Sequence, residues 1–164
     1  SPNTPGLREL QEKESLRKIF SVLKDRNSQH FKPKPILLKI APDLTIEQID
    51  DVIDLALEIK LDGLVACNTT IDRALLSEKS KVKSQKIGAG GLSGLPVQKR
   101  STEIVGYIHN KTNGQIPIIA SGGIFTAADA NEKLKAGASL LQVWTGFIYE
   151  GPAIVKNICK GLNG

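Results

Sequence analysis

The 164-residue sequence lacks the features that mark secreted, membrane-spanning and disulfide-stabilised proteins. Its 2 cysteines, Cys67 and Cys159, are too few for a disulfide framework and fit a reducing compartment. No apolar run approaches the roughly 18 residues that a membrane helix needs, and no basic and then apolar leader opens the chain. We therefore expect a soluble chain without a secretion signal. Methionine is also absent, so we expect a processed N-terminus or a piece of a longer protein.

Aromatic residues make up only 4% of the sequence, and the net charge is a modest +5. The basic residues gather in one short segment only, at Lys79, Lys81, Lys83 and Lys86. With few stacking platforms and scattered charge, the sequence argues against nucleic-acid binding and suits anionic small ligands. Neither histidine has metal-ligand spacing to the other or to a cysteine, so no metal site is expected.

Short apolar runs alternate with amphipathic stretches along the whole chain. The patterns predict helices over 7–26, 45–59, 97–112, 126–136 and about 151–161, and strands over 36–41, 63–67, 116–120 and 138–144. Thr45 and Gln48 form a predicted capping box at the start of the second helix. The nearly continuous apolar run of the first strand predicts burial on both faces, as in a parallel sheet. The alternation predicts a single α/β domain over 1–164, without an internal linker.

Polar or glycine-rich segments follow every predicted strand, whereas a doubly wound sheet would show one glycine-rich turn at its first strand. This distribution favours a (β/α)8 barrel, in which the active site and a phosphate site lie at the carboxyl ends of the strands. A complete barrel takes about 250 residues. We therefore expect the C-terminal half of a barrel, with about four βα units and parallel strands.

Each candidate segment has a functional and an ordinary interpretation. Ser121-Gly122-Gly123 with Thr145 suits a phosphate, although a plain tight turn would look alike. Lys39 interrupts an apolar strand, so it either is buried against a ligand anion or reaches solvent from the strand end. Asn68-Thr69-Thr70 offers hydrogen-bonding groups for a ligand or for a turn. The glycine-rich segment 88–96 allows close approach to a ligand or a hinge.

Three further residues carry groups that can act as nucleophiles, namely Cys67, Cys159 and Ser1. Cys67 ends a strand and is expected to contact a ligand without acting as a nucleophile, because no histidine is near it in sequence. Cys159 lies on the last predicted helix, and its side chain is expected to belong to the hydrophobic core. Ser1 is compatible with an N-terminal nucleophile hydrolase, but the α/β pattern disfavours that class.

A set of motifs, taken in order, resembles the class 2, quinone-dependent dihydroorotate dehydrogenases of pyrimidine synthesis. The motifs are Ser1-Pro2-Asn3-Thr4-Pro5-Gly6-Leu7-Arg8, Lys39-Ile40-Ala41-Pro42-Asp43-Leu44, Asn68-Thr69-Thr70, Gly90-Gly91-Leu92-Ser93-Gly94, Ser121-Gly122-Gly123-Ile124 and Gly137-Ala138-Ser139-Leu140. The resemblance implies an FMN-containing barrel that oxidises dihydroorotate to orotate and passes the electrons to a quinone.

The resemblance also implies roles for individual residues. Ser1 matches the catalytic base, and the presence of serine rather than cysteine separates class 2 from class 1. The substrate-binding positions match Asn3, Asn68 and Thr69. The FMN-binding positions match Lys39, Cys67, Gly94, Gly123, Trp144 and Thr145, with Lys39 at the pyrimidine edge of the flavin and the last two at its phosphate. Cys67 stands where relatives often have threonine, and Trp144 where tyrosine is usual.

The resemblance covers only the later strands of such a barrel. We expect the parent protein to associate peripherally with the cytoplasmic side of a membrane, and this chain alone to be inactive and to self-associate through its open edges. One alternative is a half-barrel that binds FMN or another phosphate without catalysis. Another is a related FMN barrel, such as class 1 dihydroorotate dehydrogenase or dihydropyrimidine dehydrogenase, against which Ser1 argues.

Overall fold

The computed structural model describes residues 10–74, 76, 80 and 90–162. Two of the predicted site residues, Ser1 and Asn3, lie outside these residues, as do the lysines between 79 and 86. Within the described part of the chain, no helix is long and apolar enough to cross a membrane.

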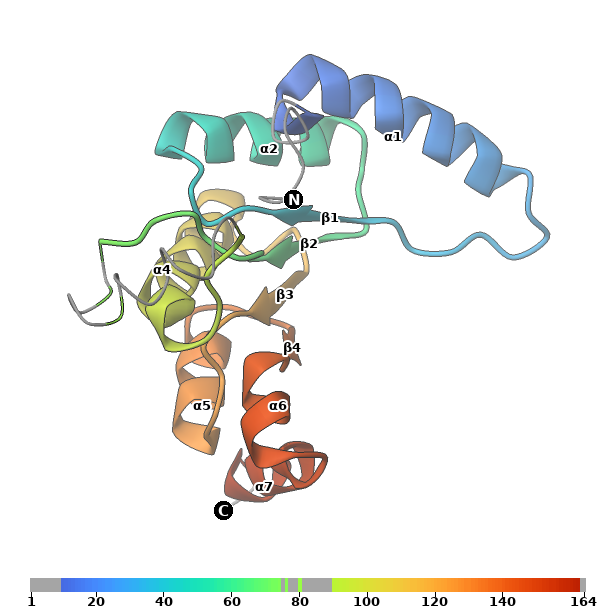
Figure 1. The fold of residues 1–164 in the computed structure, drawn as a ribbon. Helices are drawn as coiled ribbons and strands as arrows, with labels where there is room; N and C mark the ends of the chain where they lie inside the picture. The colour runs from blue at the N-terminus through green and yellow to red at the C-terminus, as the bar shows by residue number, and fades with distance from the viewer. Residues whose placement is uncertain (1–9, 75, 77–79, 81–89, 163–164) are drawn as a thin grey trace.

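Four parallel strands form one sheet in the order β1-β2-β3-β4, which is also their order along the chain. They are β1 (Leu37–Ile40), β2 (Gly63–Ala66), β3 (Ile118–Ser121) and β4 (Leu140–Gln142). The colour gradient of Figure 1 follows this order from one edge of the sheet to the other. The sheet confirms the predicted α/β class and parallel pairing, and it brings all four carboxyl ends to one edge.

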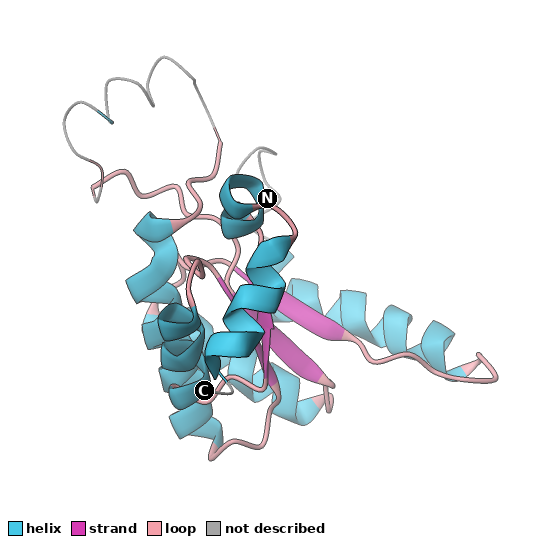
Figure 2. Cartoon of the chain, turned by 90° about the horizontal axis from the view of Figure 1, so that it is seen from below, coloured by secondary structure: helices cyan, strands magenta, loops and turns pink. Residues whose placement is uncertain are grey.

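Helices connect the strands and lie outside the sheet layer (Figure 2). They are α1 (Lys13–Ser28), α2 (Ile46–Glu58), α4 (Leu95–Thr112), α5 (Ala127–Lys135), α6 (Thr145–Glu150) and α7 (Ala153–Leu162). The predicted capping box of Thr45 and Gln48 is present at α2, and Thr126 with Asp129 makes a second one at α5. Such reciprocal bonds satisfy amide groups that a helix start leaves without partners.

The helix predicted over about 151–161 is present as α7, but the short helix α6 before it was not predicted. Two residues, Val143 and Trp144, separate α6 from the last strand. Gly151 ends α6 with a φ of 70°, in the left-handed region that favours glycine, and Pro152 follows it. The strand predicted over 138–144 is shorter than expected, because β4 covers only Leu140–Gln142 and Trp144 is already the N-cap of α6.

In the described part of the chain, helices cover one face of the sheet and leave the other open. Alternate residues of the strands, such as Ile40, Leu64 and Ile118, are fully buried in the main hydrophobic cluster beneath α1, α2 and α4. The residues between them point to the opposite face, where Leu140 remains 61% exposed. The prediction that 36–41 is buried on both faces was therefore wrong, since β1 is an edge strand with one open face.

A second, smaller cluster packs α5 against α7. It contains Ile124, Ala130, Ile154 and Ile158. Because Ile154 and Ile158 are one helical turn apart, they define the buried side of α7. Cys159 lies outside that side and is exposed, so its predicted place in the core was wrong.

Candidate functional site

The carboxyl ends of the strands are joined by backbone hydrogen bonds that continue beyond the sheet. The Cys67 amide donates to the Ser121 carbonyl at 2.9 Å, and the Asn68 amide donates to the Ile40 carbonyl at 2.8 Å. These bonds fix the segment after β2 between its two neighbouring strands. The side chains of this segment are therefore held by the sheet itself, which is the rigid part of the fold.

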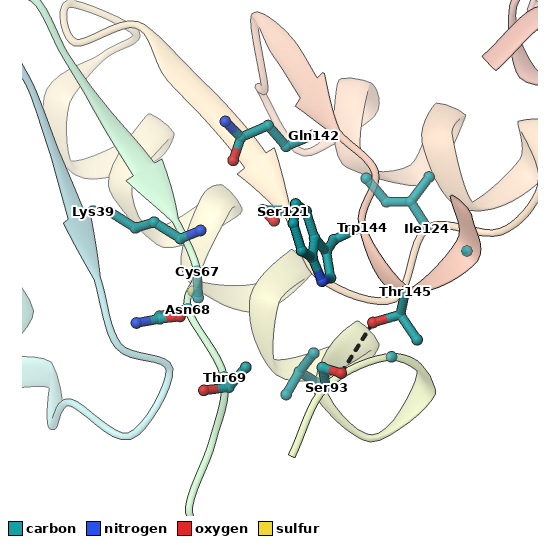
Figure 3. Close-up of a pocket in the computed structure, with 14 residues that line it drawn as sticks. Lys39, Cys67, Asn68, Thr69, Ser93, Ser121, Ile124, Gln142, Trp144 and Thr145 are labelled. Atoms are coloured by element: carbon teal, nitrogen blue, oxygen red, sulfur yellow. Dashed lines mark hydrogen bonds between the residues drawn. The ribbon is translucent and has the colours of Figure 1, made fainter. Parts of the chain in front are cut away.

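A cavity of about 300 Å³ opens at this edge of the sheet. Its lining includes seven of the predicted site residues: Lys39, Cys67, Asn68, Thr69, Gly94, Trp144 and Thr145. Figure 3 shows the side chains of Lys39, on the edge strand β1, and Trp144, just after the opposite edge strand β4, reaching toward the same space. Gly123 does not line the cavity but is adjacent to Gly122, which does. The structure thus brings together residues that are up to about a hundred positions apart in sequence.

Lys39 reaches the cavity from β1 and is exposed. The interpretation of Lys39 as a buried lysine was wrong, because the face of β1 on which it lies is not covered in this chain. Its ammonium group is nevertheless placed where a bound anion or an electron-rich ring edge would meet it.

Cys67 is 3% exposed, and burial raises the pKa of its thiol to about 12. Removing a thiolate from water is costly, so the protonated form dominates at neutral pH. Cys67 can therefore form a neutral part of the cavity wall, and its ionisation would need a large change in its surroundings.

Thr70 connects the segment after β2 to two other loops. Its hydroxyl donates to the carboxylate of Asp43, and the Ile71 amide donates to the second oxygen of that carboxylate at 3.4 Å. Its backbone pairs with Leu92 through two hydrogen bonds of 2.7 and 3.0 Å. The pairing positions the end of the glycine-rich segment, and hence Ser93 and Gly94, beside Asn68 and Thr69.

Three glycines at or next to the cavity leave the backbone open to close approach by a ligand or by neighbouring segments. Gly94 has a φ of +80°, and a Cβ atom there would come within 3.1 Å of the Thr145 methyl group. Gly122 and Gly123 have φ values of +114° and +71°, and a Cβ at Gly123 would lie 2.3 Å from the Cβ of Gln98. No other residue could adopt this arrangement without strain and steric conflict.

Two helices, α4 and α6, begin at the cavity, and neither has a side-chain cap at its N-terminus. Gly94 and Trp144 occupy the N-cap positions of α4 and α6, and neither cap makes a side-chain hydrogen bond. Thr145 and Ser93 join the two helix starts by a hydroxyl–hydroxyl bond of 3.0 Å (Figure 3). The 18-residue helix α4 therefore presents its amide groups and the positive end of its dipole to this region, an arrangement that suits an anion.

Sequence reasoning missed two residues near the site. Gln142 lines the cavity and is paired in register with Ser121, so strict alternation along β4 could have placed it on the same face. Lys133 is completely buried behind the Ser121-Gly122-Gly123 loop, on α5. Its partners come from another helix, and nothing in the local pattern signals that contact.

A parallel sheet with connecting helices and a small-molecule cavity at the carboxyl ends of its strands is the architecture of a (β/α) barrel, present here in part. The sequence comparison specifies the family. The sequence model described as dihydroorotate dehydrogenase matches residues 1–164, so the chain belongs to the dihydroorotate dehydrogenase family.

Individual relatives agree with this membership. Proteins named dihydroorotate dehydrogenase (quinone) from Christiangramia forsetii and Trichodesmium erythraeum are 55% and 53% identical to the chain over 158 and 165 residues, covering 96% and 99% of it. A crystal structure of DHODH from Eimeria tenella in complex with ferulenol superposes with a TM-score of 0.88 at 40% identity over 99% of the chain. The chain spans 45% and 43% of the two relatives and 46% of the crystallised chain.

Proposed function

We propose that the chain forms the cofactor-binding and substrate-binding half of a quinone-dependent dihydroorotate dehydrogenase, as a single partial FMN-binding domain over 1–164. The parent protein would oxidise dihydroorotate to orotate in pyrimidine synthesis and would reduce a quinone at the cytoplasmic side of a membrane. The observation that carries the proposal is the convergence of seven predicted site residues on one cavity, in a chain whose relatives are named for this reaction.

The cavity fits FMN at its phosphate end. Positive φ at Gly94, Gly122 and Gly123 leaves the backbone open to close approach, and the start of α4 adds a favourable dipole. We assign the phosphate to the loops of Gly94 and Gly123 and to Trp144 with Thr145. When bound, FMN would supply the hydride-accepting ring system. Lys39 would place a positive charge at the edge of that ring system, and Cys67 would form part of the wall beside it.

The substrate would lie against the amide and hydroxyl groups that follow β2. Asn68 and Thr69 both line the cavity, and the backbone of Cys67 and Asn68, directly before Thr69, is fixed between β1 and β3. Together with Asn3, they would hydrogen-bond the carbonyl, amide and carboxylate groups of dihydroorotate and orient its ring. Ser1 would accept the proton from C5 of dihydroorotate, and because serine is a weak base, Thr4 would help to pass this proton onward.

A chimaeric enzyme tests the proposal. This chain would replace the matching segment of the Christiangramia forsetii relative, with which it is 55% identical. We expect dihydroorotate-dependent quinone reduction by the chimaera and its loss in the Ser1→Ala variant. A folded chimaera that contains FMN but does not oxidise dihydroorotate would contradict the proposal.

The isolated chain separates binding from catalysis. We expect the purified 164-residue chain to bind FMN, measured by quenching of flavin fluorescence, but to show no turnover of dihydroorotate with a quinone or dye above the Ser1→Ala variant. Turnover above that control would show that the remaining strands of a barrel are not needed. A chimaera without activity, combined with FMN binding by the chain, would instead favour a flavin-binding module without catalysis.

A further inference from the structure

Lys133 is a lysine with no exposed surface in the interior between α4 and α5. Its Nζ donates to the Gln98 carbonyl at 2.7 Å, to the Thr102 hydroxyl at 2.6 Å and to the Ser101 hydroxyl. All three donors of the ammonium group are therefore used. Because all its donors have partners, the buried position of Lys133 is a specific feature of the fold rather than the chance covering of a surface lysine.

The hydrogen-bond partners of Lys133 in the described part of the chain are all uncharged oxygens. The nearby carboxylate of Asp129, on the same helix, accepts instead from the Gln98 side chain at 2.6 Å and from the Phe125 and Thr126 amides at 2.9 and 2.8 Å. A buried cation that is hydrogen-bonded only to neutral oxygens has lost its hydration without gaining a direct ion pair, which costs folding free energy. An anion bound close by would offset that cost.

The groups that hold Lys133 also carry the loop at the cavity. The Ser101 hydroxyl lies 3.3 Å from the Gly122 carbonyl oxygen, to which it can donate. Gln98 packs directly against Gly123, where a Cβ would lie 2.3 Å from its own Cβ. Lys133 is therefore separated from the cavity-lining loop by a single layer of side chains from α4.

We propose that Lys133 is a positioning residue for an anion site: it fixes the Ser121-Gly122-Gly123 loop through Ser101 and Gln98 and supplies a buried positive charge behind the bound phosphate. The ligand class is a phosphate monoester dianion, and its identification with the phosphate of FMN rests on the proposed function. Lys133 touches neither the substrate nor the reacting atoms. Its effect is confined to the phosphate end of the ligand.

The electrostatic surroundings make the effect sensitive to pH. Burial lowers the pKa of Lys133 to about 8, and Cys67, Glu132 and Asp129 oppose this shift. Cys67 acts on Lys133 from the position directly after β2, but its own pKa is raised to about 12, so it stays neutral at pH 8. The positive charge behind the loop is consequently lost as the pH rises through about 8. The Ser101 and Thr102 hydroxyls can still donate to the Gln98 carbonyl within α4, because these bonds do not involve Lys133.

A comparison of FMN with riboflavin, which lacks the phosphate, separates this role from a purely structural one. Dissociation constants of both flavins are measured by fluorescence quenching on the wild-type chain and on Lys133→Met, with Lys135→Met as the control because Lys135 is an exposed lysine on the same helix. We expect Lys133→Met to weaken FMN binding about tenfold, equivalent to about 1.4 kcal/mol, and riboflavin binding less than about twofold. Lys135→Met should change neither.

Two further measurements do not depend on the folding of the Lys133→Met variant. In the wild type, the preference for FMN over riboflavin should fall as the pH rises from about 7 to about 9. Ser101→Ala, which keeps the buried charge but removes the hydroxyl between Lys133 and Gly122, should lower the preference by about threefold. Equal weakening of both flavins in Lys133→Met, or a preference that is independent of pH, would overturn the proposal.

A failure of the proposed function gives a different result. If the wild-type chain binds neither flavin, the assignment to FMN is wrong, and inorganic phosphate becomes the probe. Titration with phosphate should then shift the amide resonances of Gly122 and Gly123 in a sample labelled with ¹⁵N-glycine, and Lys133→Met should abolish the shift. Shifts of the same size in both proteins would overturn the role of Lys133 independently of any flavin.

Discussion

Replacement of Gly123 by alanine should destabilise the fold through a steric conflict at the base of the candidate phosphate site. The new Cβ would lie 2.3 Å from the Cβ of Gln98 and 2.6 Å from its Cα, and the second contact is with backbone of α4, which cannot move aside as a side-chain end can. Gly123 also has a φ of +71°, which is unfavourable for alanine. Both effects act on the same loop.

Gly151 provides the matched control. Its φ of +70° is nearly identical, but a Cβ there would meet no atom within 4 Å. Gly151→Ala should therefore cost only the strain of a positive φ combined with an extended ψ of −169°, about 1–3 kcal/mol. Gly123→Ala should cost this amount plus an overpacking penalty of about 1–3 kcal/mol. The difference between the two variants isolates the steric conflict with α4.

Urea denaturation followed by far-UV circular dichroism measures both variants, because it yields the free energy of unfolding by linear extrapolation. Far-UV detection is preferable to tryptophan fluorescence, since Trp144 is 77% exposed and would report little of the transition. Free energies of unfolding for the two variants that agree within about 0.5 kcal/mol would refute the reasoning, since that is the usual range for a surface change without specific contacts. Such a result would mean that the loop can withdraw from α4 at little cost.

Three further predictions concern charge, thiols and association. The Tyr107 hydroxyl, and secondarily Lys111, lower the pKa of Asp50. This contribution to stability is complete above the unfolded pKa of about 3.9 and is lost as the pH falls through the lower folded value. The melting temperature of the wild type should thus exceed that of Asp50→Asn at pH 6, and the difference should shrink below pH 4; a constant difference would contradict the coupling. Ellman's reagent should modify Cys159 rapidly and Cys67 only after denaturation, because the Cys159 thiol is exposed whereas the Cys67 thiol is buried with a pKa of about 12. The Cys159→Ser variant should therefore lack the rapid phase. Light scattering should show self-association of the isolated chain, because β1 and β4 are edge strands and one sheet face is open; a stable monomer at high concentration would contradict this.

The fold was predictable because its signals are local. A capping box such as that of Thr45 and Gln48 needs only residues that are three apart, and the alternation of apolar runs with amphipathic stretches predicts a parallel α/β sheet. The seven residues at the cavity were predictable for a related reason. The carboxyl ends of parallel strands meet at one edge, so residues that follow different strands come together whatever their separation along the chain.

The properties that could not be predicted depend on contacts between distant segments. Lys39 is exposed although its neighbours in sequence are apolar, because the sheet face on which it lies has no cover in this chain. Lys133 is buried although it belongs to a helix with several charged residues, because Gln98, Ser101 and Thr102 of α4 supply its partners. Both lysines contradict the usual relation between local sequence pattern and burial, and both lie at or next to the candidate site.

Trp144 and Cys67, at which the resemblance implied a departure from relatives, differ in what the structure demands of their side chains. Trp144 is 77% exposed and acts as the N-cap of α6 without a side-chain hydrogen bond, so its position depends on the backbone and an exchange with tyrosine should cost little. Cys67 is 3% exposed, so a threonine at this position would bury a hydroxyl group, which needs a hydrogen-bond partner when it is shielded from solvent. A polar ligand in the cavity that Cys67 lines would be one such partner. Cysteine, with its weakly polar thiol, needs no such partner at this position.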